Sequence, residues 1–322
     1  DIDWLLMMGG GKRKFFGVNS IFSPAFYLPY EYENAKGAMS FDPNDGTNFV
    51  THSSVDLPAS PAADNLHSES IQLSLAANNT DLVVARRTVL KGHYKKEVQE
   101  KLVLFEDYCN AERRLFGENK TITEELQEKR GSKKTYATEL QAAFDKERGK
   151  QKESFVAEVK DWFEQPVNNL SDYRIENLGV RHNNPDFIYS SKFSLEGLVK
   201  KAGSNLIIDI GKLEGSTIKS TPALRKRKVD IYMPFARSIE SQIQLKVPEG
   251  YTVEGIKELN RSVRNSSGVF IVEAAFDGHT LTINIKKAYN HSFESIANWD
   301  KLIEFIDAAS DWTNSKVLLK KK

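Results

Sequence analysis

This sequence of 322 residues has one cysteine, no long apolar run and no excess of charge of either sign. The single cysteine, Cys109, excludes an internal disulfide framework and a metal site built from several thiolates. No stretch approaches the roughly 18 consecutive apolar residues of a membrane-spanning helix. The 45 basic and 44 acidic residues give a formal net charge of +1. This balance argues against nucleic acid or an anionic membrane surface as the partner.

The length and the ordinary composition are typical of a folded protein of about two domains. The chain opens at Asp1 rather than at methionine, and no signal peptide is visible. We therefore expect either that a leader has been removed or that the chain is a fragment of a longer protein.

Alternation of apolar and polar residues predicts β-strands on both sides of a central helical block. Before this block, strands are expected at residues 3–8, 14–16, 37–41, 71–75 and 83–89. After it, strands are expected at residues 173–178, 187–195, 205–210, 229–233, 243–247, 270–276, 281–285 and 316–319. The second strand of the hairpin at 71–89 carries Val83, Ala85 and Val89 on one face. Seven or more short antiparallel strands, one pair joined by Asp277-Gly278, favour a β-sandwich.

The central block, residues 93–166, favours helices. Alternating spacings of four and three predict one helix with a single stripe, formed by Val98, Leu102, Phe105, Cys109, Glu112 and Phe116 and capped by Gly117. Thr121 with Glu124 predicts a capping box, residues 131–132 predict a break, and a third helix is expected to stop before Pro166. We interpret the block as a partly exposed helical arm, whose charged stretch at residues 118–152 is typical of a solvated face. As an alternative, the arm docks a partner, with Trp162 and Phe163 at its base as anchors. A last helix is expected at residues 299–309.

The order of these segments resembles the C-terminal half of exported bacterial proteins, common in Bacteroidota, in which a transglutaminase-like domain lies between two β-rich domains of unknown function. The resemblance rests on Val247-Pro248-Glu249-Gly250-Tyr251, on residues 281–283 followed by 299–307 and 316–320, and on Gly92-His93-Tyr94. It is strongest from Val229 to the end. It implies that residues 1–65 are a remnant of a transglutaminase-like core. Residues 66–322 are then a β-sandwich domain with a helical insertion at about 93–166, in the periplasm or at the cell surface.

The same resemblance bears on catalysis. In active relatives an Asp-Pro/Ala-Thr motif, whose aspartate orients the catalytic histidine, precedes a Pro-Phe-Gly-x-Leu-Pro segment. Residues 24–29 (Pro-Ala-Phe-Tyr-Leu-Pro) resemble the second segment, which places Gly17-Val18-Asn19 at the aspartate motif. Asp42-Pro43-Asn44 is a rival match that lies further along the chain. Because glycine accepts no hydrogen bond from an imidazole N–H, the match at Gly17 implies that the orienting function is lost.

The residues themselves offer no stronger site. Cys109 lies inside an apolar stripe beside Glu106 and Asp107, an environment typical of a small buried hydrophobe rather than of a reactive thiolate. The histidines form no metal-binding spacing, so we expect structural roles, although a metal site built from distant segments stays open: they are His52, His67, His93, His182, His279 and His291. Residues 9–12 (Gly-Gly-Gly-Lys) lack the spacing of a phosphate loop and are predicted to be a hairpin turn.

Two basic runs, at residues 225–228 and 320–322, have no aromatic residues between their charges, which argues against nucleic-acid binding. The first run precedes a strand and is predicted to coat a solvent-exposed edge. We therefore predict a mixed, mostly β fold with no catalytic, cofactor-binding or metal-binding residue in this chain. The predicted function is a non-catalytic binding or scaffolding module with a protein partner in the cell envelope. Two alternatives stay open: a fragment of a cysteine peptidase or acyl-transferase whose nucleophile and histidine lie upstream, and an accessory subunit of an outer-membrane protein assembly.

Overall fold

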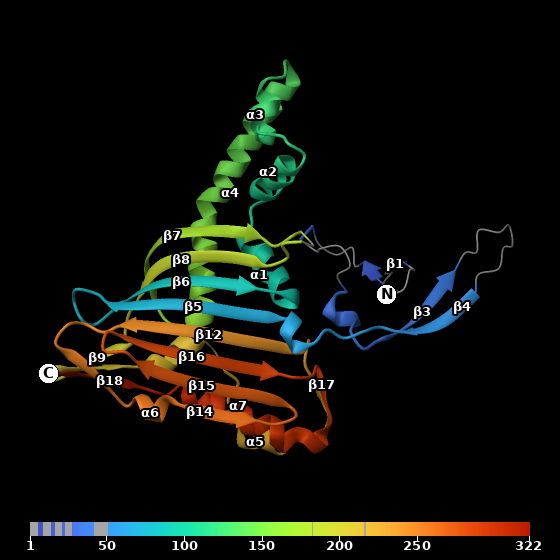
Figure 1. Cartoon of the computed structure of the whole chain (residues 1–322). Helices are drawn as coiled ribbons and strands as arrows, with labels where there is room; N and C mark the ends of the chain where they lie inside the picture. The colour runs from blue at the N-terminus through green and yellow to red at the C-terminus, as the bar shows by residue number, and fades with distance from the viewer. Residues whose placement is uncertain are drawn as a thin grey trace.

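The structure is a computed structural model that describes residues 6–8, 14–16, 21–22, 28–41, 51–181, 183–215 and 217–322. Its centre is an eight-stranded sheet (Figure 1). In spatial order the strands are β14 (Arg261–Arg264), β15 (Gly268–Phe276), β16 (Thr280–Tyr289), β12 (Arg237–Lys246), β5 (Leu66–Leu75), β6 (Leu82–Leu90), β8 (Phe187–Leu195) and β7 (Val167–Leu178). The predicted mixed, mostly β fold class is confirmed. All neighbouring strands in this sheet are antiparallel except β5 and β12, which run parallel.

The remaining strands of the described residues form smaller sheets. A four-stranded sheet has the order β13 (Tyr251–Glu254), β18 (Val317–Lys321), β10 (Asn205–Ile208) and β9 (Val199–Ala202). Three pairs of strands are separate: β1 (Leu6–Met8) with β2 (Lys14–Phe16), β3 (Lys36–Phe41) with β4 (Thr51–Asp56), and β11 (Ile231–Tyr232) with β17 (Phe293–Glu294). The hairpin predicted at the N-terminus is therefore present in β1 and β2, although its turn lies outside the described residues.

The helices of the central block form an arm that rises beyond the β7 edge of the sheet (Figure 1). The described helices are α1 (Lys95–Leu102), α2 (Phe105–Leu115), α3 (Ile122–Gln127), α4 (Ser132–Phe163), α5 (Pro222–Arg225), α6 (Ile256–Leu259) and α7 (Trp299–Trp312). The capping box of Thr121 and Glu124 is confirmed at the start of α3. Gly117 follows α2 with φ +80°, which confirms the expected left-handed cap.

The single helix predicted from Val98 to Phe116 is wrong, because the chain turns at Val103. Val103 has the extended angles φ −83° and ψ 124°, and its side chain is buried with that of Leu102. The stripe is thus divided between α1, which packs into the core, and α2, which leaves it along α4. Phe105 and Phe116, expected on the buried stripe, are instead 59% and 82% exposed.

One face of the large sheet is buried. In β6 the valines and the alanine at positions 83, 85 and 89 suggest one face as the inner one, but the buried face is the other. Leu82, Val84 and Leu90 point into the core, whereas Val83, on the same face as Ala85 and Val89, is 40% exposed. Charged and hydroxyl side chains, Arg86 and Thr88, share the buried register. For this reason a count of apolar residues does not identify the inner face.

The covering layer consists of the four-stranded sheet, α7 and the C-terminal half of α4, whose buried side chains belong to one hydrophobic cluster with those of the large sheet. Trp162 and Phe163, at the end of α4, lie within this layer. Phe163 is 2% exposed, and the Trp162 ring stacks on the imidazole of His67 with centroids 4.1 Å apart. The alternative in which these two residues anchor a partner is therefore wrong, because they pack beneath the sheet.

The hairpin of β15 and β16 confirms the turn predicted at Asp277-Gly278. The Asp277 Oδ1 atom accepts hydrogen bonds from the backbone N–H groups of His279 and Thr280 at 2.8 and 2.7 Å. The carboxylate thereby fixes the loop geometry and, with it, the register of the two strands.

Two glycines provide a matched test of this packing. A Cβ at Gly268 meets the fully buried ring of Phe305 at 2.2 Å, whereas a Cβ at Gly149, on the exposed part of α4, meets nothing within 4 Å. We expect Gly268→Ala to lower the free energy of unfolding by about 1–3 kcal/mol. Gly149→Ala is expected to raise it by about 0.5–1 kcal/mol through helix propensity. Urea denaturation of both variants measures the difference, and equal stability of the two variants contradicts this packing.

Candidate functional site

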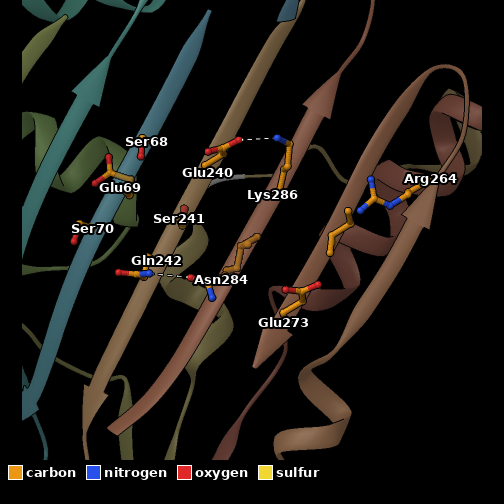
Figure 2. A pocket seen from close by; sticks show the side chains of 12 residues that line it. Ser68, Glu69, Ser70, Glu240, Ser241, Gln242, Arg264, Glu273, Asn284 and Lys286 are labelled. Atoms are coloured by element: carbon orange, nitrogen blue, oxygen red, sulfur yellow. Dashed lines mark hydrogen bonds and ion pairs between the residues drawn. The ribbon is translucent and has the colours of Figure 1, made fainter. Parts of the chain in front are cut away.

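The outer face of the large sheet is polar, and the helices and the smaller sheet lie on its other side (Figure 1). A shallow hollow of about 500 Å³ crosses this face over β5, β12, β16 and β15 (Figure 2). Ser68, Ser70, Gln242, Asn284 and Glu273 line it with hydroxyl, amide and carboxylate groups. Such groups suit hydrogen bonding to a polar surface.

Within this hollow, neighbouring strands already pair their side chains. The Lys286 Nζ atom lies 2.8 Å from Glu240 Oε1, and the Gln242 amide donates to Asn284 Oδ1 at 3.1 Å (Figure 2). These cross-strand contacts satisfy much of the polar surface. None of the twelve lining residues is a histidine or a cysteine.

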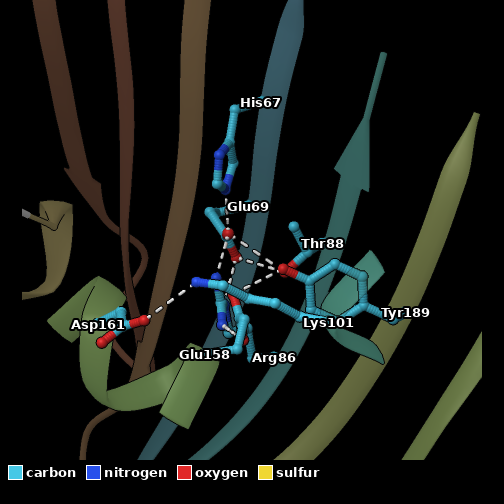
Figure 3. A network of polar contacts seen from close by, with 8 residues as sticks. All are labelled: His67, Glu69, Arg86, Thr88, Lys101, Glu158, Asp161 and Tyr189. Atoms are coloured by element: carbon cyan, nitrogen blue, oxygen red, sulfur yellow. Dashed lines mark hydrogen bonds and ion pairs between the residues drawn. The ribbon is translucent and has the colours of Figure 1, made fainter. Parts of the chain in front are cut away.

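A buried polar network lies on the opposite face (Figure 3). The Arg86 guanidinium binds Glu69 through two hydrogen bonds, of 2.6 and 2.7 Å, and binds Glu158 Oε2 at 2.7 Å. The Tyr189 hydroxyl donates to Glu158 Oε1 at 2.7 Å, and Thr88 donates to Glu69. The network therefore ties α4, which carries Glu158, to three adjacent strands of the sheet.

Electrostatics keep the pair of Glu69 and Arg86 in this network ionised. Burial alone raises the pKa of Glu69, but Arg86 and the hydrogen bond from His67 outweigh burial and lower the pKa to about 2. Burial and the Glu158 charge hold the pKa of Tyr189 well above its usual value. A carboxylate that stays charged and a phenol that stays protonated across the neutral range do not exchange protons there. The network is therefore a structural clamp and not an acid–base pair.

His67 and Glu69 have the spacing of a catalytic pair, with Nε2 and Oε1 2.6 Å apart. The ring of His67, however, is stacked on Trp162 and meets the edge of Tyr94 at a centroid distance of 5.4 Å. Both side chains are buried, so this pair orients the imidazole within the core. In the sequence, Glu69 precedes Ile71 and Leu73 at a spacing of two, so its side chain points to the same face of the strand. This spacing indicates a buried carboxylate.

The other predicted residues are scattered. His93 is buried and lies 2.8 Å from Glu33, and His291 Nδ1 lies 2.8 Å from Glu294. The His52 side chain, His182 and the candidate aspartate motifs at residues 17–19 and 42–44 lie outside what the structure describes. Among the described residues no group of three or more His, Cys, Asp or Glu side chains is arranged to hold a metal ion.

The basic run at residues 225–228 is partly tied to the protein surface. Arg225 pairs with Asp307, and the Arg227 guanidinium lies 5.9 Å from the centroid of the Trp299 ring. At the C-terminus the Lys320 ammonium lies 2.8 Å from Glu254. These contacts agree with a solvent-exposed coat on the surface of the protein.

Cys109 lies on α2, is partly buried and forms no disulfide. Burial and the nearby Glu112 charge raise the pKa of its thiol. The fraction of thiolate at neutral pH is therefore below that of an ordinary cysteine, which is the opposite of what a nucleophile requires.

A cleft of about 690 Å³ separates the arm from the edge strand β7. Asp107, Asn110 and Arg114 of α2 line one side, with residues of α4, and residues 173–181, 183 and 184 line the other. This cleft is not predictable from the sequence, because its walls come from segments about 70 residues apart that only the folded chain brings together.

The comparisons with known proteins bear on the C-terminal part. Residues 206–319 match the model of a family described as a Domain of Unknown Function with solved structure (DUF3858). The match runs from β10 to β18 and includes four of the eight strands of the large sheet. It confirms the prediction of a domain of unknown function in this region. A search of curated proteins found no match to the chain. None of the described helices has the combination of length and apolar character needed to cross a membrane.

The clamp can be tested with adjacent arginines. Arg86→Ala leaves the buried carboxylates of Glu69 and Glu158 uncompensated, and we expect it to lower the free energy of unfolding by about 3–5 kcal/mol. Arg87→Ala removes a partly exposed pair with Glu176 on the opposite face and is expected to cost about 0–1 kcal/mol. Urea denaturation checks both values. A loss of stability at Arg86 no larger than that at Arg87 means that the network is not the clamp.

Thiol chemistry tests the role of Cys109. We expect iodoacetamide at neutral pH to alkylate Cys109 in the folded protein more slowly than in the same protein unfolded in urea, because the folded environment raises the pKa and partly shields the sulfur. Intact mass against time gives both rates. Faster alkylation in the folded state shows an activated thiol and restores the nucleophile reading.

Proposed function

We propose that this chain is a non-catalytic protein-binding or scaffolding module, and that the helical arm contacts the partner. The observation that carries the proposal is the apolar exposure of α2 and its C-terminal end. Phe105, Leu115 and Phe116 are exposed there, and Tyr136 is exposed near the start of α4. Aromatic side chains on a projecting element are typical anchors of protein interfaces, where burial of the ring supplies most of the binding energy.

The arm is built to hold its shape. Arg148 of α4 bonds Glu106 and Asp107 of α2 at 2.7 and 2.6 Å, and Gln151 donates to the backbone carbonyl of Leu102. With the buried clamp of Arg86 at its base, the arm presents α2 without the ordering cost of a loose segment, and a rigid surface binds more tightly than a mobile one of the same chemistry.

The setting of the module comes from resemblance. Residues 206–319 match a domain of unknown function in the region where the likeness to bacterial transglutaminase-like proteins is strongest. We therefore propose that the chain belongs to an exported, Bacteroidota-type protein of that kind. On this proposal the chain works in the periplasm or at the cell surface, with residues 1–65 as the end of a transglutaminase-like core.

Site-specific photo-crosslinking tests the proposal. A photoreactive amino acid replaces Phe116 in the protein expressed in its source organism, and Tyr232, an aromatic residue that is 78% exposed on β11, serves as the matched control position. We expect a discrete covalent adduct at position 116 that is absent at position 232 and weakened by Leu115→Ser. No adduct at position 116, or the same adducts at both positions, contradicts the proposal. A partner that is a membrane protein favours the accessory-subunit alternative.

A further inference from the structure

The cleft between the arm and β7 carries an excess of positive charge. Its lining contains Arg114, Arg148, Arg174 and Arg181 against two carboxylates, those of Asp107 and Glu176, which leaves a charge of +2. Both carboxylates are already engaged. Asp107 binds Arg148, and Glu176 binds Arg87 of β6, the strand beyond β8 in the sheet, at 2.8 Å.

Two of these arginines have no carboxylate partner among the described residues. Arg114 forms no ion pair there, and Arg181 donates only to the backbone carbonyl of Ala111, at 3.2 Å. Ala111 lies about one helical turn before Arg114 on α2, so this bond places the Arg181 guanidinium beside the stretch of α2 that carries Arg114. Like charges held close together favour an anion between them.

The opposite wall has the form of a strand. β7 is an edge strand whose one neighbour in the described sheet is β8, so its other edge faces the cleft. Register shifts interrupt β7, and they disfavour a long, regular ladder with an added strand. The amide side chain of Asn183 lines the same cleft and offers donors and an acceptor to a polypeptide backbone, whereas Oδ1 of the buried Asn110 already accepts from the backbone N–H of Ile122 at 3.3 Å.

We propose that this cleft binds an extended, acidic segment of a partner polypeptide, whose carboxylates pair with Arg114 and Arg181. The inference rests on the proposed protein-binding function and specifies the partner's chemistry. The planar guanidinium matches a carboxylate in bidentate geometry, and the free edge of β7 accommodates an extended chain over a short length.

Fluorescence anisotropy of the full chain tests the proposal. The probe is a labelled peptide of alternating Glu and Ser, and the comparison peptide has Lys in place of Glu. We expect the acidic peptide alone to bind, with affinity that falls as salt is added. The double variant Arg114→Glu/Arg181→Glu should weaken binding at least about tenfold, because two charge-assisted contacts are lost. Lys146→Glu/Lys150→Glu, on the exposed part of α4, makes the same change of charge outside the cleft and should bind as the wild type does.

Thermal melts confirm that each variant is folded, and Arg114→Gln/Arg181→Gln gives a second, milder loss of charge. The proposal is overturned if the acidic peptide does not bind, or if both charge-reversal variants weaken it equally. Binding of polyphosphate without the acidic peptide also overturns it, in favour of a phosphate ligand. Crosslinks at position 116 report on partner binding independently, so a partner found there without peptide binding refutes only the assignment of the cleft.

Discussion

The arrangement of the described part depends on one buried cation. Arg86 is enclosed by the sheet, by the end of α4 and by the aromatic rings of Trp162, Phe163 and Tyr189, with ring centroids 5.4–5.8 Å from its guanidinium. A buried charge is tolerated only where its partners are complete. Arg86 has them, in Glu69 beside it and Glu158 above it. The position of the arm relative to the sheet is therefore set by charge pairing in the core, and both proposed contact surfaces depend on that position.

The elements of the fold were largely predictable because they follow local rules. The strand at residues 187–195, the capping box at Thr121 and the hairpin at Asp277 depend on alternation or on a side chain bonded to its own backbone, and the structure has all three. The single helix predicted through Val103 was wrong. The spacing of apolar residues continues past Val103, but the backbone leaves the helical conformation there. Leu102 and Val103 are both buried at this turn, so tertiary packing at the end of α1 accompanies the change of backbone conformation.

The cleft that contains Arg114 and Arg181 could not be predicted from the sequence, for a different reason. Arg114 and Arg181 are ordinary surface arginines in sequence, and a nearly neutral chain gives no hint of a local excess of charge. What distinguishes them is that nearby carboxylates are taken by Arg148 and Arg87, and such pairing exists only in the folded chain. The case of Cys109 differs. Burial first, and then the charge of Glu112 on the same helix, raises the pKa of its thiol, whereas the sequence pointed to Glu106 and Asp107.

The parallel contact between β5 and β12 divides the large sheet into two halves, each built from its own segments of the chain. Residues 66–90 and 167–195 form one half, residues 237–289 form the other, and eight residue pairs from Leu66 with Ser238 to Leu73 with Leu245 join them. The region that matches the family model, residues 206–319, contains only the second half. In a protein that carried this region alone, the inner strand β12 would become an edge with unpaired backbone groups, a template for association with another chain. The first half of this sheet is therefore also a cap for the second. Any protein that uses the matched region without these strands needs another element, or another molecule, to cover β12.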